Sequence, residues 1–272
     1  MYDTHIHTCS SHDSEQTFDM ICKSALSKGL SAVSFTDHVD LLIYSDEKNL
    51  KTLADTREYA EKAKQIYKNK LDIFTGVELA MPTVNKNKAD KYISMINADI
   101  VLGSVHSFDA QGKIIRFSRD DLSENAMSQD ELVKYVEAYY NEMFNIASKS
   151  DIDVLCHLTY PIRYTNQKYK RNIDIYKFSN IITQILKTII DRGIALEINT
   201  GKFDGDINDL APTPHIIQKY YEMGGRLVTI GSDAHIPQRV GCGFKEVKEL
   251  LKNIGFENYV YFKKRKPICV NL

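Results

Sequence analysis

The sequence predicts one α/β domain built as a (β/α) barrel. Short apolar stretches typical of buried strands alternate with amphipathic stretches of ten or more residues, which indicates parallel βαβ units. No linker or composition break interrupts the 272 residues, so we expect a single domain over 1–272. No glycine-rich phosphate loop follows the first strand. Seven such units in one domain favour a barrel over an open sheet.

The first expected strand covers residues 1–8 and carries His5 and His7. Residues two apart on a strand point to the same face, so both imidazoles are aimed at one place. Apolar runs predict the six further strands at 31–36, 71–77, 99–105, 153–156, 195–199 and 227–231. A last extended segment is expected at 259–262.

Helices are expected between these strands because their apolar residues recur at helical spacing. They cover 17–28, 50–70, 88–96, 129–148, 174–192, 212–223 and 245–254. Gly29, Gly193 and Gly224 follow three of them, as helix ends prefer, and the helix before Gly224 has prolines near its start. A longer loop is expected at 107–124, and it carries Arg116 and Arg119.

Composition excludes several classes of protein. The formal net charge of -1 offers no general electrostatic reason to bind nucleic acid or an anionic membrane. No apolar run approaches the roughly 18 residues of a membrane span, and the chain opens without a signal peptide, so a cytoplasmic protein is expected. The five cysteines are scattered, which argues against a disulfide framework or a thiolate zinc site.

Metal-capable side chains fall at the C-terminal ends of the predicted strands. They are His5, His7, His38, Glu78, His106, His157, Asp233 and His235. Catalytic groups gather at this rim in barrel enzymes, because the βα loops open there. One histidine at a strand end would be unremarkable, whereas six strand ends that meet at one rim predict a functional site.

The type and number of these side chains indicate the kind of site. Histidines and carboxylates without thiolates suit zinc, manganese or iron. Eight or nine ligands are too many for one ion with an open position, so two or three divalent ions are expected. A carboxylate such as Glu78 can bridge two ions, and ions roughly 3.5–4 Å apart can share a hydroxide that acts as a nucleophile.

Taken together, these segments resemble the PHP (polymerase and histidinol phosphatase) superfamily, and its histidinol-phosphatase branch in particular. The resemblance rests on residues 5–8 (HIHT), 36–38 (TDH), 76–78 (GVE), 103–106 (GSVH), 156–157 (CH), 197–200 (EINT) and 231–235 (GSDAH). They span nearly the whole chain in the family's order. The resemblance implies a distorted (β/α)7 barrel with a trinuclear metal centre at the C-terminal rim.

Matching motif to motif, the resemblance implies three sets of ligands. The first ion would be held by His5, His7, Glu78 and Asp233, and the second by Glu78, His106 and His157, so that Glu78 bridges them. The third would be held by His38, His235 and the residue six after His7, which is Asp13; the adjacent His12 is the alternative. Asp37 and Asn199 are expected to orient ligands.

Phosphate hydrolysis also needs cations at the phosphoryl oxygens, and guanidinium groups suit this role. Arg163, six residues after His157, matches an arginine of the phosphatase branch and is the first candidate. Arg116 and Arg119 are further candidates for substrate binding, and Arg239 is left open. Arg163, Glu78 and Asp233 are expected to act in catalysis.

The resulting hypothesis is a metal-dependent phosphatase of histidine biosynthesis that converts L-histidinol phosphate to L-histidinol and phosphate. A hydroxide bridging two ions would attack phosphorus in line. The expected partners are a small phosphorylated metabolite and phosphate, without nucleic acid or membrane. Alternatives are a PHP phosphoesterase for another small monoester or nucleotide, a 3′–5′ exonuclease, and a non-catalytic metal-binding module.

Overall fold

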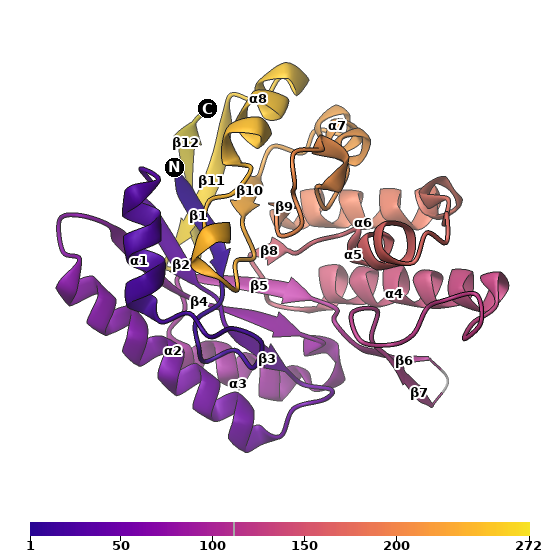
Figure 1. Cartoon of the computed structure of the whole chain (residues 1–272), viewed down its shortest axis with the longest axis horizontal. Coiled ribbons are helices and arrows are strands. Elements are labelled where there is room, and N and C mark those ends of the chain that lie inside the picture. Colours follow the sequence, from indigo (N-terminus) through magenta and orange to yellow (C-terminus); the bar gives the residue numbers. More distant parts are fainter. Residues whose placement is uncertain (111) are drawn as a thin grey trace.

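A mostly parallel sheet, nearly closed into a barrel, forms the centre of the protein (Figure 1). The computed structural model describes residues 1–110 and 112–272. Along the sheet the strands follow the order β1 (Tyr2–Ile6), β2 (Ala32–Phe35), β4 (Asp72–Ala80), β5 (Ile100–Ser104), β8 (Val154–Leu155), β9 (Ala195–Asn199) and β10 (Val228–Gly231). The expected barrel of seven βα units is thereby confirmed.

The two edges of the sheet meet between β1 and β10. Ile6 and Ala234 form a parallel bridge just beyond β10. The backbone N–H of His7 donates to the carbonyl of Ala234 at 3.0 Å, and that of Asp233 donates to the carbonyl of His5 at 2.8 Å. These bonds bring the first and last barrel strands side by side and place His5 and Asp233 at one rim.

Helices cover the outside of the barrel (Figure 1). They are α1 (Phe18–Ser27), α2 (Asp46–Ile66), α3 (Lys86–Ile96), α4 (Gln129–Lys149), α6 (Ser179–Arg192), α7 (Pro214–Glu222) and α8 (Phe244–Ile254). Side chains of Thr17, Ser45 and Ser128 accept a backbone N–H and so cap α1, α2 and α4. The sequence predicted all of these helices; α2 begins four residues earlier than expected because Ser45 supplies its cap.

Several short elements had no signal in the sequence. They are β3 (His38–Asp40), the hairpin of β6 (Phe108–Ala110) and β7 (Lys113–Ile115), the short helix α5 (Tyr160–Ile162) with the π-helical turn η2 (Arg163–Lys168), and the turns η1 (Pro82–Val84), η4 (Ile207–Asp209) and η5 (Pro237–Arg239). The helix expected over 174–192 begins instead with the 3-10 turn η3 (Ile175–Phe178), which leads into α6. At the end of the chain, β11 (Asn258–Lys263) pairs with an unexpected partner, β12 (Lys266–Asn271).

Strand β3 corrects the predicted position of Glu78. The sequence analysis placed Glu78 at the end of its strand, but β4 continues to Ala80 because it pairs with β3. In this pairing Glu78 lies opposite His38. Glu78 is therefore held from both sides within a sheet, with its side chain fully buried.

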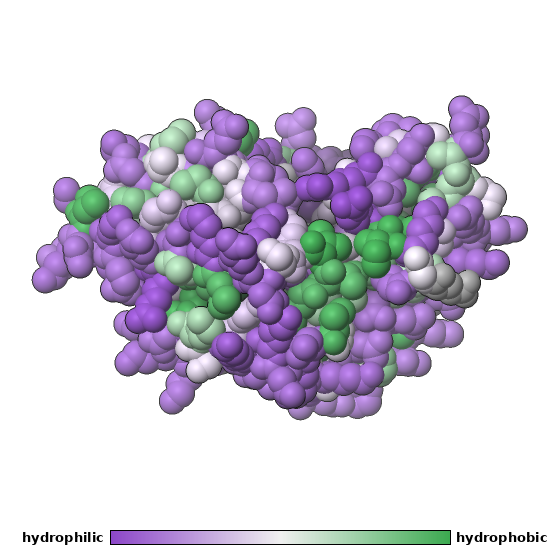
Figure 2. Space-filling model, turned by 90° about the horizontal axis from the view of Figure 1, so that it is seen from below, coloured by the Kyte–Doolittle hydropathy of each residue, from purple (hydrophilic) through white to green (hydrophobic). Residues whose placement is uncertain are grey.

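The core lies inside the barrel and between the barrel and its helices. Tyr139, Tyr140 and Met143 of α4 and Ile185 of α6 belong to its largest cluster. On the face shown in Figure 2, hydrophilic side chains cover most of the surface and apolar side chains gather in limited areas. Within the described residues, none of the helices combines the length and hydropathy needed to cross a bilayer.

Candidate metal centre

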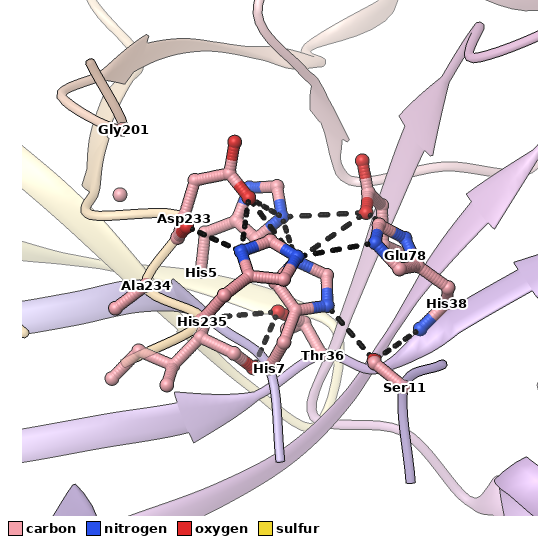
Figure 3. A network of polar contacts seen from close by, with 12 residues as sticks. His5, His7, Ser11, Thr36, His38, Glu78, Gly201, Asp233, Ala234 and His235 are labelled. Atoms are coloured by element: carbon pink, nitrogen blue, oxygen red, sulfur yellow. Dashed lines mark hydrogen bonds and ion pairs between the residues drawn. The ribbon is translucent and has the colours of Figure 1, made fainter. Parts of the chain in front are cut away.

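The first group of predicted ligands gathers where β1 meets β10 (Figure 3). Nε2 of His5 and Nε2 of His7 lie 3.0 Å apart, and both rings are fully buried. Asp233 Oδ1 lies 3.2 Å from Nε2 of His7 and 3.6 Å from Nε2 of His5. Oε2 of Glu78 completes the group, at 3.5 Å from Nε2 of His5 and 3.6 Å from Nε2 of His7.

The second group shares Glu78 with the first. Its other oxygen, Oε1, lies 2.9 Å from Nε2 of His157 and 3.0 Å from Nε2 of His106. These two nitrogens are 3.3 Å apart. Oε1 of Glu78 thus faces His106 and His157, whereas Oε2 faces His5 and His7 and also lies 2.7 Å from Nδ1 of His38. Two oxygens that face different histidines are what a bridging ligand requires.

The third group contains His38, His235 and Asp13. The Nε2 atoms of His38 and His235 are 3.4 Å apart. Oδ1 of Asp13 lies 3.5 Å from Nε2 of His38 and 3.4 Å from Nε2 of His235. His12 has other partners: its Nδ1 lies 2.6 Å from Tyr44 Oη, and Nη2 of Arg119 donates to its Nε2 at 2.6 Å. The geometry therefore brings Asp13, and not His12, to these two histidines.

Neighbouring groups orient the imidazoles so that Nε2 faces the centre. Nδ1 of His5 donates to Oε1 of Glu197 at 2.5 Å, and Nδ1 of His235 donates to the carbonyl of Asp233 at 2.9 Å. The hydroxyl of Ser11 gives its proton to Asp37 at 2.7 Å, so at 3.1 Å it accepts from Nδ1 of His7. In each neutral imidazole the remaining Nε2 lone pair points inward.

Electrostatics keep the carboxylates of Glu78 and Asp233 ionised. Burial raises the pKa of Glu78, but the imidazoles of His106 and His38 outweigh burial and hold this pKa well below its usual range. The same balance, with His5 and His7 as the neighbours, lowers the pKa of Asp233. Burial and the neighbouring imidazoles lower the pKa of His7, which favours its neutral form. The pKa values of His5, His38 and His235 are raised instead, because neighbouring carboxylates outweigh burial, so a metal ion has to displace protons from these rings. Ionised carboxylates and neutral imidazoles are the forms that bind metal ions.

The residues at this rim fit divalent metal ions. Because the Nδ1 atoms of His5 and His7 donate elsewhere, their Nε2 lone pairs, 3.0 Å apart, repel each other unless a proton or a metal ion lies between them. Two nitrogen ligands of one tetrahedral zinc ion lie about 3.3 Å apart, since each Zn–N bond is about 2.0–2.1 Å long. Oε2 of Glu78 is buried, and its short contact of 2.7 Å with Nδ1 of His38 lacks the geometry of a hydrogen bond. Overlapping sets of these residues, one of which includes Cys156, bring ligand atoms close enough for one ion.

A cavity of about 720 Å³ opens over the third group. Its lining includes the three arginines that were predicted to bind substrate, Arg163, Arg116 and Arg119, as well as Arg239. Arg163 is the most enclosed of these: its side chain is 6% exposed, its Nη2 donates to Oδ1 of Asn199 at 2.8 Å, and its Nη1 lies 3.8 Å from Asp233. Its Nε is buried without a partner.

Arg239 is occupied elsewhere, because its Nη2 donates to the carbonyls of Thr200 and Phe203. The Nε atom of Arg116 is buried without a partner, like that of Arg163. Arg163 and Arg116 therefore offer N–H groups at the cavity, which is what an anionic ligand needs.

Sequence reasoning placed Glu197 in a family motif without giving it a role, and it missed Ser11. Glu197 holds His5 through Oε1, and its Oε2 accepts the backbone N–H of His157 at 2.7 Å. A carboxylate inside the apolar run 195–199 was a usable signal, because an isolated buried charge is costly. Ser11 gave no such signal, since its role depends on contacts with His7 and Asp37.

Comparison with known proteins agrees with this geometry. The model of the PHP domain family matches residues 3–201. The chain belongs to the PHP domain family. This confirms the resemblance inferred from the motifs and places His5, Glu78, His106 and His157 within the matched part of this PHP-domain protein.

Relatives of the PHP-domain protein cover its whole length. A probable histidinol-phosphatase of Clostridium acetobutylicum is 31% identical, with 97% of this chain and 98% of the relative aligned. A probable histidinol-phosphatase of Thermotoga maritima is 28% identical over the full length of both proteins. The crystal structure of the Lactococcus lactis histidinol phosphate phosphatase, complexed with zinc, L-histidinol and phosphate, superposes with a TM-score of 0.82 at 23% identity, covering 98% of each chain. This likeness confirms the fold.

Proposed function

We propose that this protein is a metal-dependent phosphatase that hydrolyses L-histidinol phosphate to L-histidinol and phosphate, with residues 1–272 forming one catalytic domain. Three groups of inward ligand atoms, two of which share Glu78, lie below a cavity lined by Arg163 and carry the proposal. The names of the Clostridium and Thermotoga relatives support the substrate. So does the Lactococcus structure, which contains zinc, L-histidinol and phosphate.

In this proposal the protein holds two or three divalent ions. The first group (His5, His7, Glu78, Asp233), the second (Glu78, His106, His157) and the third (Asp13, His38, His235) would each hold one ion. Zinc, manganese and iron suit such nitrogen and carboxylate ligands. Bound ions supply positive charge at the phosphoryl oxygens and lower the pKa of water.

The protein's own side chains position the substrate. Arg163 donates to phosphoryl oxygens through the N–H groups that Asn199 leaves free, and Arg116 contributes from the neighbouring segment. Asn199 also donates to Oδ2 of Asp233 at 3.2 Å, so the arginine and the carboxylate keep a fixed separation. A guanidinium fixed before the reaction stabilises charge that develops on the phosphoryl group without reorganising.

The experiment that tests the substrate is phosphate release by purified, metal-analysed protein. L-histidinol phosphate is compared with a panel of nucleotides and sugar phosphates. We expect kcat/KM of about 10⁴ M⁻¹s⁻¹ or above for L-histidinol phosphate alone. Broad, weak hydrolysis of the whole panel would retain the phosphatase chemistry and reject this substrate.

A second candidate is a PHP phosphoesterase that acts on another small monoester or a nucleotide. The cavity volume of about 720 Å³ supports this candidate, because such a volume admits ligands larger than L-histidinol phosphate. Preferential hydrolysis of one nucleotide or sugar phosphate in the same panel would establish it. A metal-loaded protein that hydrolyses none of the panel would instead support a non-catalytic metal-binding module.

A further inference from the structure

Three loops of the barrel rim meet at His12. His12 belongs to the loop between β1 and α1, Tyr44 lies between β3 and α2, and Arg119 lies between β7 and α4. Tyr44 Oη is 2.6 Å from Nδ1 of His12, and Nη2 of Arg119 is 2.6 Å from its Nε2. All three side chains line the cavity above the metal centre. They make no part of the three ligand groups.

The direction of these hydrogen bonds follows from the chemistry of the donors. A guanidinium has only donors, so the contact with Arg119 requires a lone pair on Nε2 of His12. The proton of the neutral imidazole then lies on Nδ1 and is donated to Tyr44 Oη. Both nitrogens of His12 are thereby used, and neither is left for a metal ion. The hydroxyl proton of Tyr44 remains free for a ligand.

Tyr44 is held in place by a further contact. The ammonium group of Lys48, in the first turn of α2, lies 3.3 Å from the centre of the Tyr44 ring. A cation over an aromatic face is an attractive arrangement. The ring of His12 also meets that of Tyr44 edge to face, with centroids 5.5 Å apart. The phenol therefore fixes the position of His12, while Arg119 sets its tautomer.

Holding Arg119 also holds Arg116. The backbone N–H of Arg119 donates to the carbonyl of Arg116 at 3.0 Å, and the carboxylate of Asp120 accepts the N–H of Arg116 at 2.7 Å. The carbonyl of Asp120 in turn accepts from Tyr169 Oη at 3.2 Å, at the end of η2. Since η2 begins with Arg163, this hydrogen bond connects the segment that carries Arg116 and Arg119 with the turn that carries Arg163.

We propose that His12 is a positioning residue that holds Arg119 at the mouth of the cavity, so that Arg119 and the Tyr44 hydroxyl bind anionic oxygens of the phosphorylated substrate. This inference rests on the proposed function for the class of ligand, a phosphate monoester. It assigns His12 a role outside the metal centre. Arg119 becomes the substrate contact, and His12 acts only through it.

A double-mutant cycle on phosphate binding tests the role of the pair. Inorganic phosphate is titrated calorimetrically into the metal-loaded protein and its variants His12→Phe, Arg119→Met and the double variant. We expect each single substitution to raise Kd by about fivefold to tenfold, because each removes the same charged contact. The double variant is expected to be no weaker than the weaker single variant. Effects that multiply in the double variant would overturn the proposal, as would wild-type affinity in Arg119→Met.

Conservative and control variants sharpen the test. His12→Gln places an amide oxygen near the position of Nε2 and is expected to bind phosphate within about twofold of wild type. His215→Phe and Arg57→Met replace exposed side chains outside the cavity lining and are expected to change nothing. Bound metal is measured in every variant. Metal lost from His12→Phe but retained in Asp13→Ala would make His12 a ligand and overturn the proposal.

A spectroscopic readout separates this inference from the proposed function. In ¹⁵N-edited NMR spectra, the imidazole signals that disappear in His12→Phe belong to His12. We expect a proton on Nδ1 and none on Nε2. This measurement needs neither phosphate nor turnover, so it tests the contact between His12 and Arg119 even if L-histidinol phosphate is not the substrate. A proton on Nε2 would show that Arg119 is not held by His12.

Discussion

The imidazole of His5 and the carboxylate of Glu197 form a buried hydrogen bond of 2.5 Å between Nδ1 and Oε1. Both side chains are fully buried. The other oxygen of Glu197 accepts the N–H of His157, whose backbone has the unusual φ of 24°. One carboxylate thus orients a residue of the first ligand group and fixes the backbone of a residue in the second.

Glu197→Gln is expected to weaken metal binding by about 10- to 100-fold, because the substitution removes the negative charge that makes Nε2 of His5 a stronger metal ligand. Competition with a chromophoric chelator measures the affinity. Glu222→Gln, at the exposed end of α7, is the matched control. Unchanged metal affinity would show that the hydrogen bond only serves packing.

Arg163→Ala is expected to lower kcat/KM by about 10²-fold or more, since it removes a fixed cation from the developing charge. Metal content should remain unchanged, because Arg163 belongs to none of the ligand groups. Steady-state kinetics on metal-analysed protein measure both. Arg57→Ala, on the outer face of α2, is the control. A wild-type value in Arg163→Ala would remove this arginine from the site.

Glu78→Gln is expected to lose both metal and activity. The neutral amide has one acceptor oxygen and cannot serve two groups of histidines as the carboxylate does. Elemental analysis after gel filtration gives the metal content per chain. Full occupancy in the variant would contradict the bridging role.

Removal of metal is expected to lower the melting temperature. A ligand that binds only the folded state at 100 times its Kd adds about 2.7 kcal/mol, which corresponds to roughly 5–10 °C for a domain of this size. Calorimetry of chelator-treated protein, with and without added zinc, measures the difference. Glu78→Gln should no longer respond to zinc. A wild-type melting temperature that is independent of zinc would argue against a metal bound at this buried centre.

Much of the barrel could be predicted because its strands and helices carry their own signals. Residues 195–199 form an apolar run followed by turn residues, and β9 covers that range. By contrast, β3 spans only His38–Asp40 and exists through its pairing with β4. The β6–β7 hairpin and β12 likewise depend on partners, so local sequence did not indicate them.

The candidate site shows the same division. Strand periodicity and the spacing of the motifs were enough to name the side chains that gather at the rim, because strand ends of a parallel barrel share one edge. Spacing favoured Asp13 over His12 but left His12 as the alternative, because the hydrogen-bond partners of His12 lie in other loops. Glu197 contacts His5 across 192 positions of the chain, which no local pattern records.

The pairing of β1 with β10 has a consequence for biosynthesis. His5 and His7 are made early and Asp233 and His235 late, yet they complete the same groups of ligand atoms. The two ends of the chain also lie together, where the rings of Tyr2 and Tyr261 stack with centroids 4.3 Å apart (Figure 1). A nascent chain that stalls before β10 carries every ligand of the second group but lacks Asp233 of the first and His235 of the third. The complete centre can therefore assemble only after translation has passed the last barrel strand.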